Sequence, residues 1–227
     1  MRTLVFDTET TGLPKTQIVS PSTIHLWPHI VQFSYIIFDT DANKIVKIKD
    51  SIIKVPETVT ISEENANIHG ITTEISLAKG VSLQPVLKEF FVDLNTADHI
   101  VGHNVSFDLN MIKAELQRLT IGCFNVDEVT KFQEYTTKLN TSTNIHCTMQ
   151  ETIEYCAIEL KDKFGRHYKK FPKLVELYQK MFNVTPKNLH NSLVDVIVCL
   201  RCFMKFKYNV DIVERSEEVK QMIIDYL

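Results

Sequence analysis

The run Thr3-Leu-Val-Phe-Asp-Thr-Glu9 decides how the N-terminal part of this chain folds. Its first four residues are apolar or β-branched, which is typical of a buried strand, and Gly12-Leu-Pro14 just beyond it indicates a loop. Side chains two residues apart leave a strand on the same face, so Asp7 and Glu9 point one way and Thr8 the other. Two carboxylates therefore converge at the end of a buried strand.

Further elements are expected on the C-terminal side of this strand. Residues 30–38 and 45–55 have strand-like patterns around a turn-rich stretch at 39–43, and together with the first strand they predict an antiparallel meander. Helices are expected at 62–70, 82–94, 105–119, 150–157, 173–182, 192–206 and 217–226, short strands at 100–101 and 145–149, and polar connections at 125–144 and 161–172. This order predicts an α/β fold with a mixed five-stranded sheet flanked by helices.

Length and composition favour one packed domain. The 227 residues are 44% hydrophobic and 23% charged, so we expect a single domain over 1–227, with a core at about 3–206 and a C-terminal helix at about 211–227. The net charge of -3 argues against a general electrostatic grip on nucleic acid but allows a small site for a strand end. Five cysteines and two acids near the N-terminus favour a reduced, intracellular protein, with the choice between nucleus and cytoplasm open. No apolar stretch approaches the ~20 residues needed to cross a bilayer, so no membrane partner is expected.

Three later residues extend the list of candidate site residues. Asp195 interrupts the apolar run Leu193–Val198, where an ionised carboxylate needs compensation by a cation or by hydrogen bonds. His190 precedes Asp195 by five residues and can share its site only if a helix begins after it, at residue 191 or 192. Asp108 lies in the first turn of the helix expected at 105–119, where an acid can also simply complement the helix dipole. If these acids cluster, a bound divalent cation is the simplest way to offset the repulsion between their charges.

Three motifs occur in order along the chain: Asp7-Thr-Glu-Thr-Thr-Gly-Leu-Pro14, Gly102-His-Asn-Val-Ser-Phe-Asp108 and His190-Asn-Ser-Leu-Val-Asp195. They resemble the exonuclease motifs of the DEDDh family, a ribonuclease H-like group that includes the proofreading subunits of bacterial DNA polymerases. Ile68-His-Gly-Ile-Thr72 is similar to a short element between the first two motifs of that family. The resemblance covers nearly the whole chain. Cys147 departs from it, because many members have an aspartate there, and this leaves the substrate class open.

The resemblance implies a ribonuclease H-like fold and a metal-dependent 3′ to 5′ exonuclease that releases nucleoside 5′-monophosphates. Two Mg²⁺ or Mn²⁺ ions suit an all-carboxylate site and stabilise the attacking and leaving oxygens of a phosphodiester. By carry-over, Asp7 bridges both ions, Glu9 and Asp195 hold the ion on the side of the nucleophile, and Asp108 supports the other. His190 takes the proton from the attacking water, a role for which histidine is suited around neutral pH.

Substrate contacts and partners follow from the same resemblance. Leu13 resembles the apolar wedge beside the terminal base, and Thr10 and Asn104 are expected to contact the terminal nucleotide, with loop packing and helix capping as their alternatives. The expected substrate is a single-stranded or frayed 3′ end, of DNA first and of RNA second, and a DNA polymerase is a candidate partner. The competing hypothesis is a catalytically silent nucleic-acid-binding or polymerase-binding module on the same fold. It would require a lost ligand, and all five key residues are present.

A basic segment between the second and third motifs interleaves cations with aromatic rings. Its cations and rings are Lys161, Lys163, Arg166, His167, Lys169, Lys170 and Lys173, with Phe164, Tyr168 and Phe171. This mixture suits the binding of single-stranded nucleic acid, in which bases stack on rings and phosphates meet cations. A solvated loop is the alternative.

Overall fold

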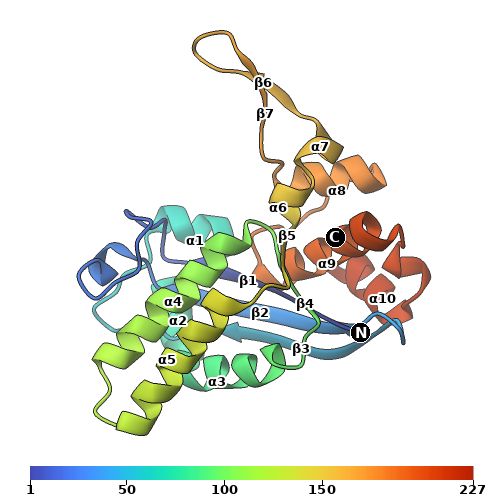
Figure 1. Cartoon of the computed structure of the whole chain (residues 1–227). Helices are drawn as coiled ribbons and strands as arrows, with labels where there is room; N and C mark the ends of the chain where they lie inside the picture. Colours follow the sequence, from blue (N-terminus) through green and yellow to red (C-terminus); the bar gives the residue numbers. More distant parts are fainter. Residues whose placement is uncertain (227) are drawn as a thin grey trace.

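A mixed five-stranded sheet forms the central layer of the computed structural model, which describes residues 1–226 (Figure 1). Its strands are β1 (Arg2–Thr10), β2 (Ile30–Asp39), β3 (Lys44–Ile52), β4 (His99–Gly102) and β5 (Ile145–Cys147). The strand order is β3-β2-β1-β4-β5. The first three strands form the expected antiparallel meander, while β4 and β5 run parallel to β1. The predicted α/β fold is confirmed.

Helices cover both faces of the sheet (Figure 1). They are α1 (Glu63–His69), α2 (Thr73–Lys79), α3 (Leu83–Leu94), α4 (Val105–Ile121), α5 (Val126–Thr141), α6 (Thr148–Glu151), α7 (Ile153–Cys156), α8 (Leu174–Phe182), α9 (Ser192–Tyr208) and α10 (Glu217–Tyr226), with 3-10 turns η1 (Ile24–Leu26) and η2 (Ile212–Glu214). Within residues 1–226, no helix combines the length and apolarity that crossing a membrane requires.

Each face of β1 packs in a different core. Leu4 and Phe6 are buried with residues of α3, α4 and α5. Val5, on the opposite face, is buried with residues of α9 and α10. Because side chains alternate along a strand, the residues that follow in β1 are presented to α4 and to α9 in turn. This alternation positions the acids of the first motif.

The expectation of a polar connection at 125–144 is wrong, because α5 occupies most of it. Its buried side chains are Phe132, Tyr135 and Leu139, which share one side of the helix at spacings of three and four. They complete the core on the α4 side of the sheet. Apart from Val126 and Val129 the rest of the helix is polar, and this polarity hides a stripe with only three buried apolar residues.

The expectation of a connection at 161–172 is also wrong in part. Strands β6 (Glu159–Lys161) and β7 (His167–Lys169) form a hairpin that projects away from the sheet and helices (Figure 1). At its turn, Asp162 Oδ1 accepts hydrogen bonds from the backbone N–H groups of Phe164 and Arg166 at 2.8 and 2.9 Å. Gly165 closes the turn with a φ of 79°, which glycine adopts without steric cost.

Other differences are changes of boundary. The strand expected at 45–55 ends at Ile52 in β3, and the one expected at 145–149 ends at Cys147, where α6 begins. The helix expected at 150–157 is divided between α6 and α7, and α2 was not foreseen. The expected C-terminal helix at 211–227 consists of η2 and α10, and residue 227 lies outside the described residues.

Candidate active site

The acids of the first motif lie where β1 ends between α4 and α9. Asp7 and Glu9 share the face of Val5 and so are presented to α9, whereas Thr8 is presented to α4. The backbone N–H and the hydroxyl of Thr8 both donate to Asp108 Oδ1, at 2.9 and 2.7 Å. Asp108 is only 2% exposed, in the first turn of α4. One strand thus provides two acids and fixes the orientation of a third.

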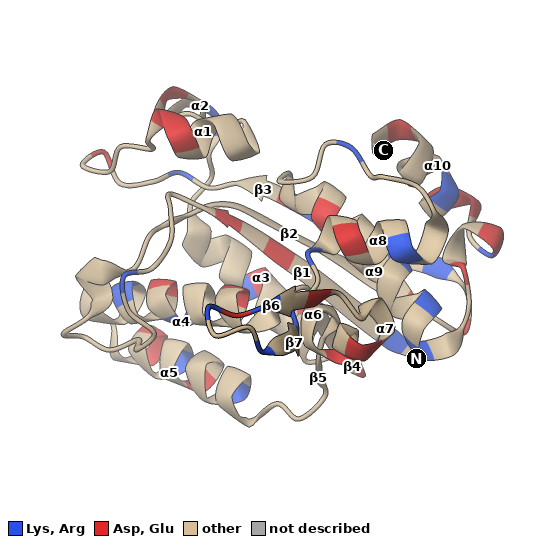
Figure 2. Cartoon of the chain, turned by 90° about the horizontal axis from the view of Figure 1, so that it is seen from above, with Lys and Arg blue, Asp and Glu red and all other residues tan. Residues whose placement is uncertain are grey.

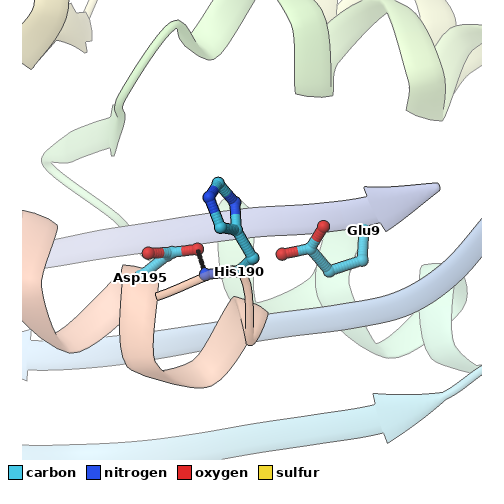
Figure 3. Close-up of side chains that lie close together, drawn as sticks. All are labelled: Glu9, His190 and Asp195. Atoms are coloured by element: carbon cyan, nitrogen blue, oxygen red, sulfur yellow. Dashed lines mark hydrogen bonds between the residues drawn. The ribbon is translucent and has the colours of Figure 1, made fainter. Parts of the chain in front are cut away.

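The start of α9 places His190 and Asp195 together. The Asn191 side chain caps this helix by accepting from the backbone N–H groups of Leu193 and Val194, so His190 lies on the preceding loop, as expected. The backbone N–H of His190 donates to Asp195 Oδ2 at 2.9 Å. One ligand atom from each of Glu9, His190 and Asp195 lies within 4.8 Å of the other two, and Figure 3 shows these side chains facing one another.

Burial raises the pKa of all four acids, and repulsion from neighbouring acids adds to this rise for Asp7, Glu9 and Asp108. Desolvation is the largest cause for Asp7, whose pKa is held well above its ordinary value, with further contributions from the charges of Asp108, Asp195 and Glu9. Desolvation, followed by Asp195 and Asp108, raises the pKa of Glu9 to about 9. Burial raises the pKa of Asp195 to about 7.

Asp108 has a pKa of about 7, because desolvation outweighs the opposing hydrogen bonds from Thr8. In the part of the chain that the structure describes, none of the four carboxylates forms an ion pair with Lys or Arg. A cluster of desolvated acids without a cationic side chain suits a bound metal cation, which would restore their ionised forms.

These residues line a cleft of about 510 Å³. Its other lining residues include Leu13, which is 82% exposed, and Asn104, which begins α4 in a left-handed conformation and makes no side-chain capping bond. Phe171 and Lys173, just beyond the β6–β7 hairpin, also line the cleft. Thr10 is the one expected site residue that does not line this cleft, since its buried hydroxyl donates to the carbonyl of Gly12 at 2.6 Å.

A family model described as an exonuclease, RNase T, matches residues 4–203. The chain belongs to the RNase T exonuclease family. The match extends from the first acid motif to the end of the third, and it confirms the resemblance to DEDD-type exonucleases and the ribonuclease H-like fold. A comparison with curated protein sequences gives no significant match.

Solved structures share the fold of this RNase T family chain at low sequence identity. Exonuclease I of E. coli in complex with a dA16 oligonucleotide is 18% identical with a TM-score of 0.56, over 92% of this chain and 41% of that one. Exonuclease I of Methylocaldum szegediense is 15% identical with a TM-score of 0.57, over 93% and 42%. A 3′-exonuclease that recognises a histone mRNA stem-loop is 10% identical with a TM-score of 0.58, over 92% and 64%. The chain thus spans about two fifths of the length of exonuclease I.

Sequence reasoning missed the side chains of β2 that support the start of α9 in this RNase T family chain. Gln32 and Ser34 stand opposite Glu9 and Asp7 across the β1–β2 ladder. Gln32 Oε1 accepts from the backbone N–H of Ser192 at 3.2 Å, and the hydroxyls of Ser34 and Ser192 are 2.5 Å apart. The sequence does contain a signal for these two residues. Both are polar, both interrupt the apolar strand at 30–38, and they lie two residues apart, so their side chains leave the strand on the same face.

His103 was also missed, although it lies within the second motif. It is largely buried and lines the cleft, and desolvation lowers its pKa to about 4. Its Nε2 donates to the carbonyl of Pro172 at 3.0 Å, and its Nδ1 lies 3.0 Å from the Thr148 hydroxyl. Because a carbonyl only accepts, the neutral ring has its proton on Nε2 and accepts from Thr148. His103 therefore fixes the chain at the point where it returns from the β6–β7 hairpin.

Proposed function

We propose that this chain is a metal-dependent 3′ to 5′ exonuclease that hydrolyses phosphodiester bonds at the 3′ end of a strand and releases nucleoside 5′-monophosphates. One observation carries the proposal: four carboxylates, the buried Asp108 and the partly buried Asp7, Glu9 and Asp195, meet on one cleft with the exposed His190 and without a Lys or Arg partner in residues 1–226. Membership of the RNase T exonuclease family supports the reaction class.

The donor set suits two Mg²⁺ or Mn²⁺ ions, because it consists of hard carboxylate oxygens. Asp7, Glu9, Asp108 and Asp195 would hold the ions, which when bound stabilise the negative charge of the phosphate during hydrolysis. A zinc-bound form of E. coli exonuclease I is among the similar structures and supports a metal requirement. His190 would accept the proton of the attacking water, with Asp195 holding its backbone through the 2.9 Å hydrogen bond.

DNA is the first candidate substrate and RNA the second. Exonuclease I of E. coli, which binds DNA oligonucleotides, and the histone mRNA 3′-exonuclease support one choice each. Leu13 is exposed at the edge of the cleft, where its side chain would stack against the terminal base, and Asn104 would contact the terminal nucleotide. Thr10 would act indirectly, by holding the loop that carries Leu13. A polymerase partner and a single-domain organisation stay predictions.

The test uses three 5′-labelled or internally labelled substrates: linear single-stranded DNA, linear RNA of the same sequence, and closed circular single-stranded DNA. We expect stepwise shortening of a linear strand from its 3′ end with Mg²⁺ or Mn²⁺, no reaction in EDTA, and an intact circle. The Asp7→Asn protein, purified in parallel, controls for contaminating nucleases. Cleavage of the circle by wild type but not by Asp7→Asn would indicate an endonuclease. Inactivity of wild type on every substrate with both metals would indicate a silent binding module.

A further inference from the structure

The β6–β7 hairpin differs in charge from the rest of the chain. Residues 159–173 contain six Lys or Arg and two acids, a formal charge of +4, although the whole chain has -3. The remaining residues therefore sum to -7. Figure 2 shows the Lys and Arg of the hairpin beside the labels β6 and β7, and residues of both charges over the body of the fold. The only strands with which β6 and β7 pair in the described residues are each other, so both outer edges face solvent.

Not all the cations of the hairpin are free to meet a ligand. Arg166 pairs with Asp162 at 2.7 Å, and Lys170 pairs with Glu176 at 2.6 Å. Lys169 pairs with Glu154. Within residues 1–226 the exposed lysines of this segment without an ion pair are Lys161, Lys163 and Lys173. Three cations of the basic segment are thus available to a ligand: Lys161 and Lys163 lie on the hairpin, and Lys173 lies at the cleft.

The same hairpin exposes apolar and aromatic side chains. Phe164 at its turn is 71% exposed, and its ring centroid lies 5.1 Å from Lys163 Nζ and 5.4 Å from Arg166 Cζ. Tyr168 stands opposite Leu160 across the two strands, and both are more than 40% exposed. Rings beside cations offer stacking faces for bases and charges for phosphates, which is the combination that single-stranded nucleic acid requires.

The hairpin is continuous with the cleft. Phe171 and Lys173, which follow β7, line the cleft that contains the four acids. His103 fixes this wall through Pro172, so the hairpin leaves the body of the fold from an anchored position. Phe164 lies in the turn, and the five residue steps from Arg166 to Phe171 give a reach of at most roughly 17 Å at about 3.3 Å per residue. A strand whose 3′ end lies in the cleft can therefore follow the hairpin outward.

We propose that the β6–β7 hairpin binds the single strand upstream of the 3′ end, with Lys161 and Lys163 against phosphates and Phe164 stacked on a base. This inference rests on the exonuclease function proposed above, since it requires a strand in the cleft. It adds an accessory binding surface that makes affinity depend on strand length. A strand too short to leave the cleft contacts Lys173 alone among the three available lysines.

The test compares the affinities for dT4 and dT16, each 5′-labelled with fluorescein, by anisotropy in Ca²⁺ buffer across a salt series. In wild type we expect dT16 to bind at least tenfold more tightly than dT4. In the variant Lys161→Ser/Lys163→Ser the affinities for dT16 and dT4 should become nearly equal. The slope of log K against log salt concentration for dT16 should decrease in magnitude by about 1.4, since each lost single-strand phosphate contact removes about 0.7. Phe164→Ala should weaken dT16 by about tenfold or more, since base stacking on a ring is worth that much.

The matched control is Lys131→Ser/Lys138→Ser, which removes the same charge from two exposed lysines of α5 that form no ion pair within residues 1–226. It should keep the wild-type ratio and slope. A hairpin variant with an unchanged ratio and slope would overturn the proposal and leave the hairpin as a solvated element or a protein-docking one. If wild type neither binds nor shortens dT16 or an RNA of the same length with Mg²⁺ or Mn²⁺, the exonuclease function fails as well, so the two failures are distinguishable.

Discussion

Thr8 and Asp108 are joined twice: the backbone N–H and the hydroxyl of Thr8 both donate to Asp108 Oδ1, at 2.9 and 2.7 Å. Hydrogen bonds to the charged form of a carboxylate oppose the rise in pKa that burial causes, and for Asp108 they limit it to about 7. Thr8 thus keeps a fully buried acid close to ionisation near neutral pH and also fixes the carboxylate relative to β1.

Replacing Thr8 by Val removes the hydroxyl donor at almost constant volume. We expect the pKa of Asp108 to rise further and the apparent affinity for Mn²⁺ at pH 7 to fall about 10-fold to 100-fold, the usual effect of losing a partner of a metal ligand. Turnover at saturating Mn²⁺ should change less. Thr3→Val on the same strand is the control, because the buried Thr3 hydroxyl has no hydrogen-bond partner in residues 1–226. Equal Mn²⁺ affinities for all three proteins would contradict a supporting role for Thr8.

Asp7→Asn should reduce hydrolysis by orders of magnitude, because it removes a proposed metal ligand, the acid whose pKa is raised by the charges of all three others. In EDTA the same variant should melt at a higher temperature than wild type, by about 2–4 °C for each kcal/mol of repulsion removed in a chain of this size. Added Mn²⁺ should then stabilise wild type more than the variant. Glu57→Gln, which removes an exposed acid with no ion pair in the described chain, is the control for a general change of charge. Near wild-type turnover by Asp7→Asn would exclude the proposed metal site.

The raised pKa of Glu9, about 9, predicts a pH dependence of stability in the absence of metal. Unfolded glutamate titrates near 4.3, so between pH 7 and pH 9 the folded protein binds more protons than the unfolded one, and the free energy of unfolding falls as pH rises. The lowered pKa values of His69, His99 and His103 affect stability mainly below this window, because unfolded histidine titrates near 6.5. Urea denaturation in EDTA at pH 7, 8 and 9 measures the slope.

Burial also raises the pKa of the Cys199 thiol. This cysteine therefore also makes the free energy of unfolding fall as pH rises toward 9. The informative quantity is therefore the difference between wild type and Glu9→Gln, which keeps the cysteine contribution and removes that of Glu9. We expect the slope to be shallower in Glu9→Gln, and Mn²⁺ to flatten the slope of wild type. Parallel slopes for the two proteins in EDTA would mean that Glu9 is ionised throughout this range.

The sequence predicted the sheet and the acids of the cleft because both depend on local patterns. The continuous apolar run of β1 and the apolar run around Asp195 each identify a buried position within a few residues. The cap at Asn191 likewise fixed where α9 begins, and with it the loop position of His190. Family motifs then connected positions far apart in the chain, which composition and periodicity cannot do.

The remaining features depend on tertiary contacts that a local pattern does not contain. The three buried residues of α5 are recognisable as a stripe only once α4 and α3 provide the surface that covers them. The β6–β7 hairpin has exposed strands, so burial leaves no alternation in its sequence. His103 forms its hydrogen bond with Pro172, 69 residues away, and the ion pairs that occupy Arg166, Lys169 and Lys170 are equally invisible in a count of charges.

The position of His190 fits two roles, a metal ligand and a general base, because a ring nitrogen lies within 4.8 Å of carboxylate oxygens of Glu9 and Asp195. We expect it to be the base. His190 has a φ of 70°, a left-handed conformation that asparagine adopts more readily than alanine. His190→Asn should therefore keep the backbone hydrogen bond to Asp195 while removing the imidazole, and His190→Ala serves as the second variant.

Loss of a general base typically lowers the rate by 10² to 10⁴, so single-turnover rates of both variants on linear DNA in saturating Mn²⁺ should fall at least about 100-fold. Their affinity for Mn²⁺, measured by direct titration without nucleic acid, should stay within a few fold of wild type, because a base is not a ligand. The increase of the wild-type rate with pH on the acid side should also disappear in both variants. A variant that loses Mn²⁺ affinity in proportion to its rate would instead make His190 a ligand, and a variant that keeps the same acid-side increase would assign proton removal to another group in the cleft.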